Sequence, residues 1–206
     1  SFFSGKVSAK NLVTSTLGDE LILNNPKSKV IGISLDAGSA ILLTGHNASG
    51  VYWFDQEKGT FVTSSYFAEN IPVWLDTFNN KGFSKLYIDR EWKALNPINT
   101  YEEADTAKVK SVETKKRLSD KLKSFVEGII GKPQPTTNYS RLTESPFGNL
   151  LTKDMAIATV VGEDLGRDEH TDLLCLTFSA NRNIGQKYGP HSIEMEDTYL
   201  KLDKEI

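Results

Sequence analysis

The stretch KVIGISLDAGSAILLTG, residues 29–45, decides the fold. Its opening run, KVIGISL, is short, continuously apolar and rich in β-branched residues, which is typical of a strand buried on both faces of a parallel sheet. The run SAILLTG at 39–45 then restarts a helical pattern. Between the two lie Asp36, Ala37 and Gly38, at the carboxyl end of the predicted strand. The stretch therefore predicts a β–loop–α unit.

The second half of the chain repeats the alternation of helix and strand. The segment SPFGNLLTKDMAIATVVGEDLG (145–166) predicts a helix, and DLLCLTFS (172–179) predicts a second buried strand. A polar loop is expected at 181–186, and a helix at 191–206. The apolar stripe of that helix consists of Met195, Tyr199, Leu202 and Ile206. This order favours an α/β fold with a mainly parallel, doubly wound sheet flanked by helices.

Further elements are predicted in the first half of the chain. Apolar residues at every third or fourth position indicate a helix over residues 9–24. The runs VYWFD (51–55) and TFVTSSYF (60–67) are separated by QEKG and predict a hairpin. A helix is expected at 71–82, with Pro near its start and Gly just past its end, followed by a less regular helical segment at 83–92.

Residues 96–145 differ in character from the rest of the chain. The first part is charged and the last part is rich in turn-forming residues. We interpret the region as a cap-like insertion over the sheet, with one helix in RLSDKLKSFVEGII (117–130). The whole chain, 1–206, is interpreted as a single fragment of one domain, because both ends look cut. Removal of flanking strands would leave open sheet edges, so the fragment is expected to self-associate.

Composition limits the class of partner. The chain has 206 residues and a formal net charge of −3, which does not favour nucleic acid or an anionic membrane surface. No apolar run approaches the roughly 18 residues that a membrane span needs. The single cysteine, Cys175, cannot form an internal disulfide and is expected to be a small core residue. His46, His170 and His191 lack metal-ligand spacing and are expected in loops or at the surface.

Two strand ends are the candidate sites for chemistry. In parallel α/β sheets, ligands bind outside the carboxyl ends of the strands. Asp36–Ser39 and Asn181–Gln186 follow the two predicted buried strands. The alternative is that both segments merely turn the chain. No nucleophile elbow, dinucleotide-binding glycine motif or phosphate-binding loop is present in the sequence.

Three stretches resemble the alkaline phosphatase superfamily, in its bacterial type I phosphodiesterase/nucleotide pyrophosphatase-like branch. They are NLVTSTLGDEL with KVIGISLDAGSAILLTGH, then GVYWFD with GTFVTSSYF, and SPFGNLLTKDMAIA with DLLCLTFSANRNIGQKYGPHSIEMEDTYLKLDKEI. The resemblance is to the middle of the family's catalytic domain. It implies a hydrolase of phosphate esters with two zinc ions and a Thr or Ser nucleophile between them, in a periplasmic or exported protein.

The resemblance also marks two departures. The family's strand-end motif, Ser-x-x-Asp-x-x-Gly-His, supplies an Asp and a His to one zinc ion, and here Arg182 and Gln186 occupy these positions. Arginine has no lone pair to donate and stays protonated, so it is not a zinc ligand. A Lys and an Arg that contact phosphate in a monoesterase subgroup are replaced by Asp36 and Gly38. We therefore predict no catalytic residue, no metal ligand and no cofactor for this chain, with Asp36, Gly38 and Arg182 as candidates to bind a phosphate-containing or other anionic small ligand.

Two functions remain open. The first is a non-catalytic phosphatase fold, deficient in metal, that binds a ligand. The alternative is part of an active metal-dependent phosphodiesterase or alkaline phosphatase, since the resemblance places the nucleophile before Ser1 and further metal ligands after Ile206. An unrelated α/β protein is the third possibility, and an antiparallel central sheet would support it.

Overall fold

The computed structural model describes residues 7–103 and 139–206. Its sheet has four strands in the order β3-β2-β1-β4. They are β1 (Val30–Ser34), β2 (Gly50–Asp55), β3 (Thr60–Val62) and β4 (Leu173–Thr177). Strand β1 pairs in parallel with both β2 and β4, and β3 pairs antiparallel with β2. The predicted α/β fold with a mainly parallel sheet is confirmed, and so is the hairpin, although β3 is shorter than expected.

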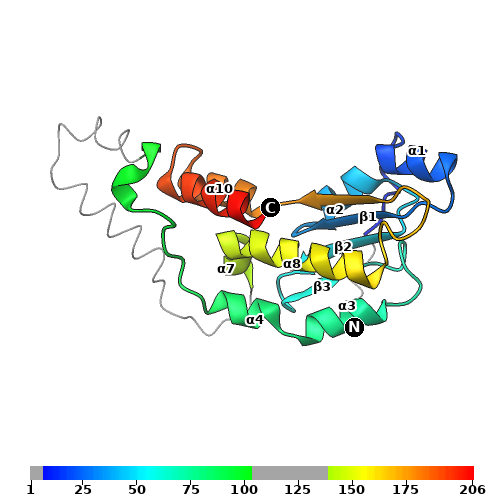
Figure 1. Cartoon of the computed structure of the whole chain (residues 1–206), viewed down its shortest axis with the longest axis horizontal. Coiled ribbons are helices and arrows are strands. Elements are labelled where there is room, and N and C mark those ends of the chain that lie inside the picture. Colours follow the sequence, from blue (N-terminus) through cyan, green and yellow to red (C-terminus); the bar gives the residue numbers. More distant parts are fainter. Residues whose placement is uncertain (1–6, 104–138) are drawn as a thin grey trace.

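Helices flank this sheet on both sides (Figure 1). They are α1 (Leu17–Asn24), α2 (Ala37–Thr44), α3 (Val73–Asn80), α4 (Phe83–Ile88), the 3₁₀ helix η1 (Ile98–Thr100), α7 (Ser140–Thr143), α8 (Pro146–Gly162), α9 (Ala180–Tyr188) and α10 (Ile193–Glu205). Helix α10 lies beyond the end of the sheet opposite α1 (Figure 1). None of the helices in the described ranges is long and apolar enough to cross a membrane.

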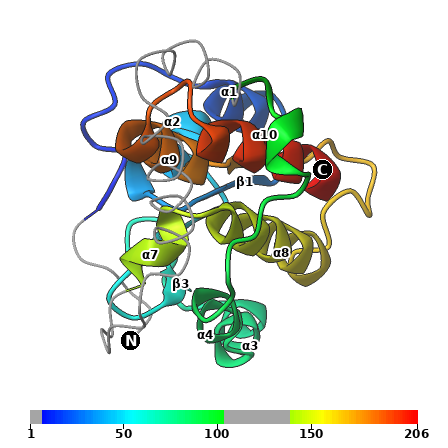
Figure 2. The same cartoon turned by 90° about the vertical axis from the view of Figure 1, so that its left-hand side faces the viewer.

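The alternation of side chains along the strands creates two cores. Ile31, Ile33, Tyr52 and Phe54 share one buried cluster with residues of α8, whereas Val51 belongs with residues of α2 to a second cluster. Figure 2 shows α2 and α8 on opposite sides of β1. Because successive strand residues point to opposite faces, a strand that is apolar at every position can serve both cores. The central strands therefore carry an unbroken apolar run, as the sequence predicts.

The predicted start of the first helix is wrong. Helix α1 begins at Leu17 rather than at residue 9. Thr16 ends the preceding irregular segment, because its hydroxyl accepts a hydrogen bond from the N–H of Asp19 and the Asp19 carboxylate accepts one from the N–H of Thr16. Val13, which belongs to the periodic pattern, is fully exposed at 100%. The local capping pair therefore outweighs the apolar spacing upstream of it.

Two expectations for the last third of the chain are also corrected. The predicted polar loop at 181–186 lies inside α9, where Ala180 and Ile184 are buried four residues apart. Strand β4 is only half-buried along its length, including Cys175, because it is an edge strand of the described sheet. In the predicted stripe of α10, Met195 packs against the larger core, but Tyr199 is 55% exposed and Ile206, just past the helix, is 86% exposed, so only the beginning of the stripe faces a core in this chain.

A buried carboxylate holds residues 92–101 against α10. Asp197 is fully buried and accepts hydrogen bonds from Trp92 Nε1 at 2.5 Å, Leu95 N at 2.7 Å and Tyr101 Oη at 2.6 Å. Lys201 Nζ also donates to it. Burial raises the pKa of Asp197, but the bonds from Lys201, Tyr101 and Trp92 outweigh burial and lower it. A carboxylate with so many donors is a structural anchor.

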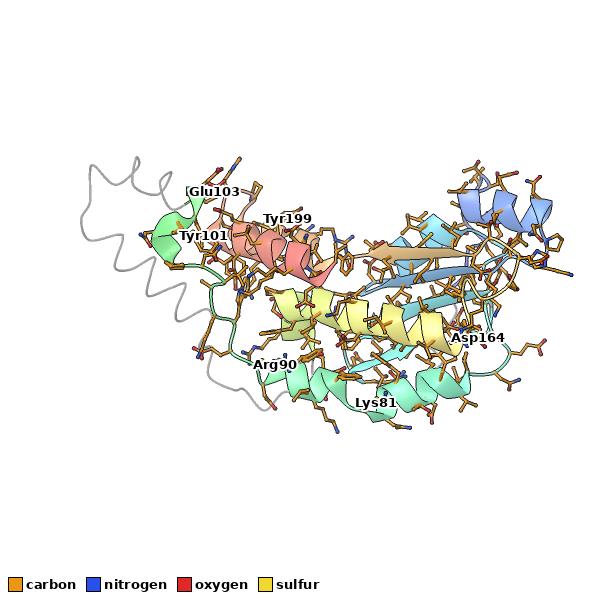
Figure 3. The ribbon with its side chains drawn as sticks, in the orientation of Figure 1. Lys81, Arg90, Tyr101, Glu103, Asp164 and Tyr199 are labelled. Atoms are coloured by element: carbon orange, nitrogen blue, oxygen red, sulfur yellow. The ribbon has the colours of Figure 1, made fainter. Side chains whose placement is uncertain are left out.

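The predicted cap at 96–145 is described only at its two ends. Helix η1 lies at the beginning of this region and α7 at its end. The helix expected at 117–130 lies outside the described residues. At the beginning of the region, Tyr101 and Glu103 lie close to Tyr199 of α10 (Figure 3). Asp164, just past the C-terminal end of α8, lies far from them (Figure 3). The cap therefore remains an expectation.

Candidate functional site

The structure brings the two predicted strand ends together. Strands β1 and β4 are neighbours and run in parallel, with Ser34 opposite Thr177. At this edge, the hydroxyl oxygens of Ser34 and of Ser179, two residues past Thr177, lie 3.3 Å apart, within hydrogen-bonding distance. Both serines are buried. Sequence reasoning did not single them out, although each is a small polar residue at the end of an apolar strand.

Asp36 has a structural role at this edge of the sheet. It is the N-cap residue of α2, and its Oδ1 accepts a hydrogen bond from the N–H of Ser39 at 2.9 Å. Its Oδ2 accepts from Ser34 Oγ at 3.3 Å. Capping satisfies one of the backbone N–H groups that the first turn of a helix leaves free, and aspartate is among the residues that do this best. The segment therefore turns the chain, and it also presents a carboxylate at the strand ends.

Arg182 reaches that carboxylate from the other strand end. It lies on α9, and its Nη2 is 3.4 Å from Asp36 Oδ2. The Arg182 side chain is 55% exposed and that of Asp36 is 34% exposed. Residues predicted separately as ligand-binding candidates thus form an ion pair across the two strand ends. An anionic ligand that binds Arg182 has to compete with Asp36 for the guanidinium.

Gln186 and Gly38 complete the set of predicted positions. Gln186 follows Arg182 by four residues on α9, so both lie on the same face of the helix. Gly38 is exposed in the first turn of α2. A Cβ atom at Gly38 would meet only Asp36 Oδ1, at an ordinary contact distance of 3.6 Å. The backbone does not require glycine there, so a longer side chain would fit.

The residues at this edge do not fit a zinc ion. Zinc takes carboxylate, imidazole or thiolate ligands. Asp36 is an anionic residue that could be a metal ligand here. Its carboxylate, however, already accepts hydrogen bonds from Ser39 and Ser34 and pairs with Arg182. In the ranges 7–103 and 139–206, no three His, Cys, Asp or Glu side chains are grouped closely enough to hold a metal ion. A guanidinium next to Asp36 would repel a dication.

A second buried carboxylate fixes the loop after α2. Asp19 is 2% exposed and accepts from the N–H groups of His46 and Asn47 at 2.8 and 2.9 Å. Burial raises its pKa, but hydrogen bonds from Asn47, Thr16 and His46 outweigh burial and lower the pKa to about 2. Gly45 has a φ of +84°, and a Cβ there would come within 2.0 Å of Asp19 Oδ2. His46 therefore helps to hold the loop, through its backbone N–H and through its ring Nδ1, which lies 3.3 Å from Asp19 Oδ2.

Comparison with known proteins identifies the family. The family model described as type I phosphodiesterase / nucleotide pyrophosphatase matches residues 11–206. The chain belongs to this family. The predicted resemblance to the alkaline phosphatase superfamily is confirmed.

Curated relatives include two alkaline phosphatases. The chain is 38% identical over 203 residues to the alkaline phosphatase PhoV of Synechococcus elongatus, covering 98% of the chain and 36% of that protein. It is 36% identical over 215 residues to the alkaline phosphatase PafA of Elizabethkingia meningoseptica, covering 98% of the chain and 37% of that protein. A crystal structure of wild-type PafA superposes with a TM-score of 0.71 at 34% identity, covering 91% of this chain and 36% of that one.

The matches to these relatives cover only part of each relative. The chain spans a little more than a third of the length of the relatives that it matches, at 36% and 37%. It has the fold of an alkaline-phosphatase-like phosphodiesterase or phosphatase over that part. The roles of Asp36, Gly38, Arg182 and Gln186 stay predictions.

Proposed function

We propose that this chain is a phosphatase-fold unit whose strand-end site has lost metal chemistry and serves a binding role. The observation that carries the proposal is the ion pair between Arg182 and Asp36, 3.4 Å apart. In the pattern that the resemblance implies, a carboxylate ligand of zinc stands at the Arg182 position and a phosphate-binding cation at the Asp36 position. Each position carries the opposite charge in this chain, and the two charges meet.

The exchange of charges has a direct chemical consequence. A zinc site attracts an anionic substrate through the charge of the metal, and its ligands are anionic or neutral. Here a permanently protonated guanidinium takes the place of a ligand and neutralises the carboxylate opposite. The ion pair between Asp36, which follows β1, and Arg182 of α9 thereby joins the two strand ends without a metal ion. The chain alone is accordingly proposed to be inactive toward phosphate esters and to need no cofactor.

The proposed ligand of this edge is a small anion that competes with Asp36 for Arg182. Arginine binds phosphate and carboxylate groups through paired N–H donors. Neutralising Asp36 should therefore strengthen binding of inorganic phosphate at Arg182, whereas neutralising Arg182 should remove it. A periplasmic or exported location is proposed from the family alone.

The second candidate function is part of an active metal-dependent phosphodiesterase or alkaline phosphatase. The observation that favours it is the identity of 38% and 36% to two proteins named as alkaline phosphatases. In that case the remaining machinery would belong to a longer polypeptide, and the Arg182–Asp36 pair would open or lie beside the metals.

A hydrolysis assay of the chain tests the proposed loss of activity, and a phosphate titration tests the proposed binding role. The purified chain should not hydrolyse p-nitrophenyl phosphate or bis(p-nitrophenyl) phosphate above the rate in buffer, with or without added zinc. Phosphate titrations by calorimetry should show stronger binding to Asp36→Asn than to the unmodified chain, and no such gain in Asp36→Asn/Arg182→Gln. Zinc-dependent hydrolysis by the unmodified chain would overturn the proposal.

A further inference from the structure

The outer edge of β4 is open in the described part of the chain. Strand β4 pairs with β1 on one side, and Figure 1 shows it at the margin of the sheet, away from β2 and β3. The N–H of Leu173 donates to the carbonyl oxygen of Lys29 at 2.8 Å, so the alternation along β4 turns the N–H and C=O groups of Leu174 and Leu176 outward. Among the residues that the structure describes, none forms a hydrogen bond with these outward groups. They are therefore available to pair with a further strand.

The opposite edge of the sheet is closed by a side chain. Asn79 of α3 donates from Nδ2 to the carbonyl oxygen of Phe61 in β3, and its Oδ1 accepts from the N–H of Phe61, both at 2.9 Å. The amide thus occupies the backbone groups that a further strand would use. Strand β4 has the sequence LLCLT, without the charged residues or proline that commonly protect an edge. Of the two edges of the described sheet, β4 is the one fit for pairing.

Apolar side chains flank this edge in both helical layers. Cys175 Sγ of β4 lies 3.8 Å from the carbonyl oxygen of Leu43 in α2, and Leu43 is 42% exposed. On the other face, Val160 of α8 is 40% exposed and lies seven residues after Lys153, which pairs with α10, so Val160 belongs to the side of α8 that faces away from α3. A strand added at β4 would bring its own helical layers against both side chains.

Two copies of this edge are complementary to each other. A two-fold axis perpendicular to the sheet places β4 antiparallel to its copy, with Leu174 of one copy opposite Leu176 of the other and Cys175 opposite Cys175. The outward N–H and C=O groups of the two leucines then exchange hydrogen bonds across the axis. Asp172 falls opposite Phe178, so this register sets no like charges of the strand ends against each other.

We propose that the chain forms a homodimer through β4, in which two four-stranded sheets join into one. The exposed Leu43 and Val160 of each copy lie at the joint, so the contact includes apolar side chains as well as backbone hydrogen bonds. The proposed dimer does not depend on the strand-end site of the proposed function.

Cys175 reports the register of the dimer. Its N–H and C=O groups face β1, as those of Leu173 do, so the two copies of Cys175 form a non-hydrogen-bonded pair with Cα atoms about 4.5 Å apart. That separation is within the roughly 4.4–6.8 Å that a disulfide spans. Diamide should therefore join the two copies covalently. In that step two thiols are oxidised to one disulfide, and diamide takes up both electrons and both protons.

The test is sedimentation velocity of the whole chain over a concentration series in the presence of reductant. A monomer–dimer equilibrium is expected. Leu43→Lys and Val160→Lys should each weaken dimerisation roughly tenfold or more, because each change occurs twice in a two-fold contact and brings like charges together. Val73→Lys is the matched control, since Val73 is 82% exposed and lines the separate apolar groove of about 860 Å³ between α3 and α8. It should leave the dimer unchanged, and thermal melts of each variant verify folding.

Oxidation gives a second, independent readout. Diamide at alkaline pH should convert the unmodified chain to a covalent dimer, Leu43→Lys should cross-link poorly, and Cys175→Ser should dimerise without cross-linking. A chain that stays monomeric at every concentration would overturn the proposal. So would a dimer that is weakened by Val73→Lys but by neither Leu43→Lys nor Val160→Lys, because the contact would then lie at the groove between α3 and α8. A dimer that diamide does not cross-link would contradict the register and with it the two-fold pairing of β4.

Discussion

Neutralising Asp36 tests the ion pair at the strand ends. The change Asp36→Asn removes the charge but keeps a side-chain oxygen that can cap α2, since asparagine and aspartate are similarly good N-cap residues. Arg182→Gln removes the opposite charge from an exposed side chain. The two changes and their combination form a double-mutant cycle, in which the coupling energy isolates the pair from the separate roles of each residue.

The structure sets the size of the coupling. The two atoms are 3.4 Å apart, but the side chains are 55% and 34% exposed, so water and salt screen the attraction. Exposed pairs of this kind couple by about 0.2–1 kcal/mol in the free energy of unfolding, and we expect about 0.5 kcal/mol. The capping bond between Asp36 and Ser39 should survive in Asp36→Asn. Asp36→Ala should therefore cost about 1 kcal/mol more than Asp36→Asn.

Urea unfolding at low ionic strength, followed by circular dichroism, measures the coupling. The same cycle at about 1 M salt, where the Debye length falls to about 3 Å, should give a smaller value. A coupling energy of zero at low salt, with Asp36→Asn equally destabilising in the presence and absence of Arg182, would refute the reasoning. The charges would then be neighbours without an energetic link.

Three further changes test other parts of the structure. The pKa of Asp19 falls from 3.8 to about 2 on folding, so its stabilisation of about 2 kcal/mol is complete above about pH 4 and is lost as the pH falls toward 2; the stability difference between the unmodified chain and Asp19→Asn, from urea titrations at several pH values, should shrink over that range. Asp197→Asn leaves Lys201 partly buried without its carboxylate, and should lower the unfolding free energy by about 3 kcal/mol; a cost below about 1 kcal/mol would contradict the anchor. Gly38→Ala should stabilise the chain by about 0.5–1 kcal/mol in thermal melts, whereas Gly32→Ala, whose Cβ would lie 2.5 Å from the Ala40 carbonyl oxygen, should destabilise it.

The strands and most helices could be predicted because their patterns are local. The run around Ile31 could be predicted because every residue of β1 is buried, with Ile31 in the larger core and Gly32 close against α2 on the other face, and the run that ends in β4 has a similar pattern. The half-buried state of β4 could not be predicted, because it depends on which strand lies beside it. Likewise, the start of α1 is set by the capping pair of Thr16 and Asp19 and not by the apolar spacing.

The charged members of the candidate site were predictable from the sequence, but Ser34, Ser179 and the geometry of the site were not. Position at a strand end identified Asp36, and the family pattern identified Arg182. That the two side chains pair follows only from the adjacency of β1 and β4, which is a long-range property of the sheet. The helical state of α9 escaped prediction because polar residues separate the buried Ala180 and Ile184.

Zinc content tests the central claim most directly. The purified chain is equilibrated with zinc, freed of unbound metal by gel filtration and analysed for zinc, beside the variants Arg182→Asp/Gln186→His and Gln186→His. The account predicts no bound zinc in the unmodified chain and a gain in the double variant that exceeds the gain from Gln186→His alone. One zinc ion per unmodified chain that is lost on changing Asp36 or Gln186 would contradict the claim that an ion pair has replaced the metal site.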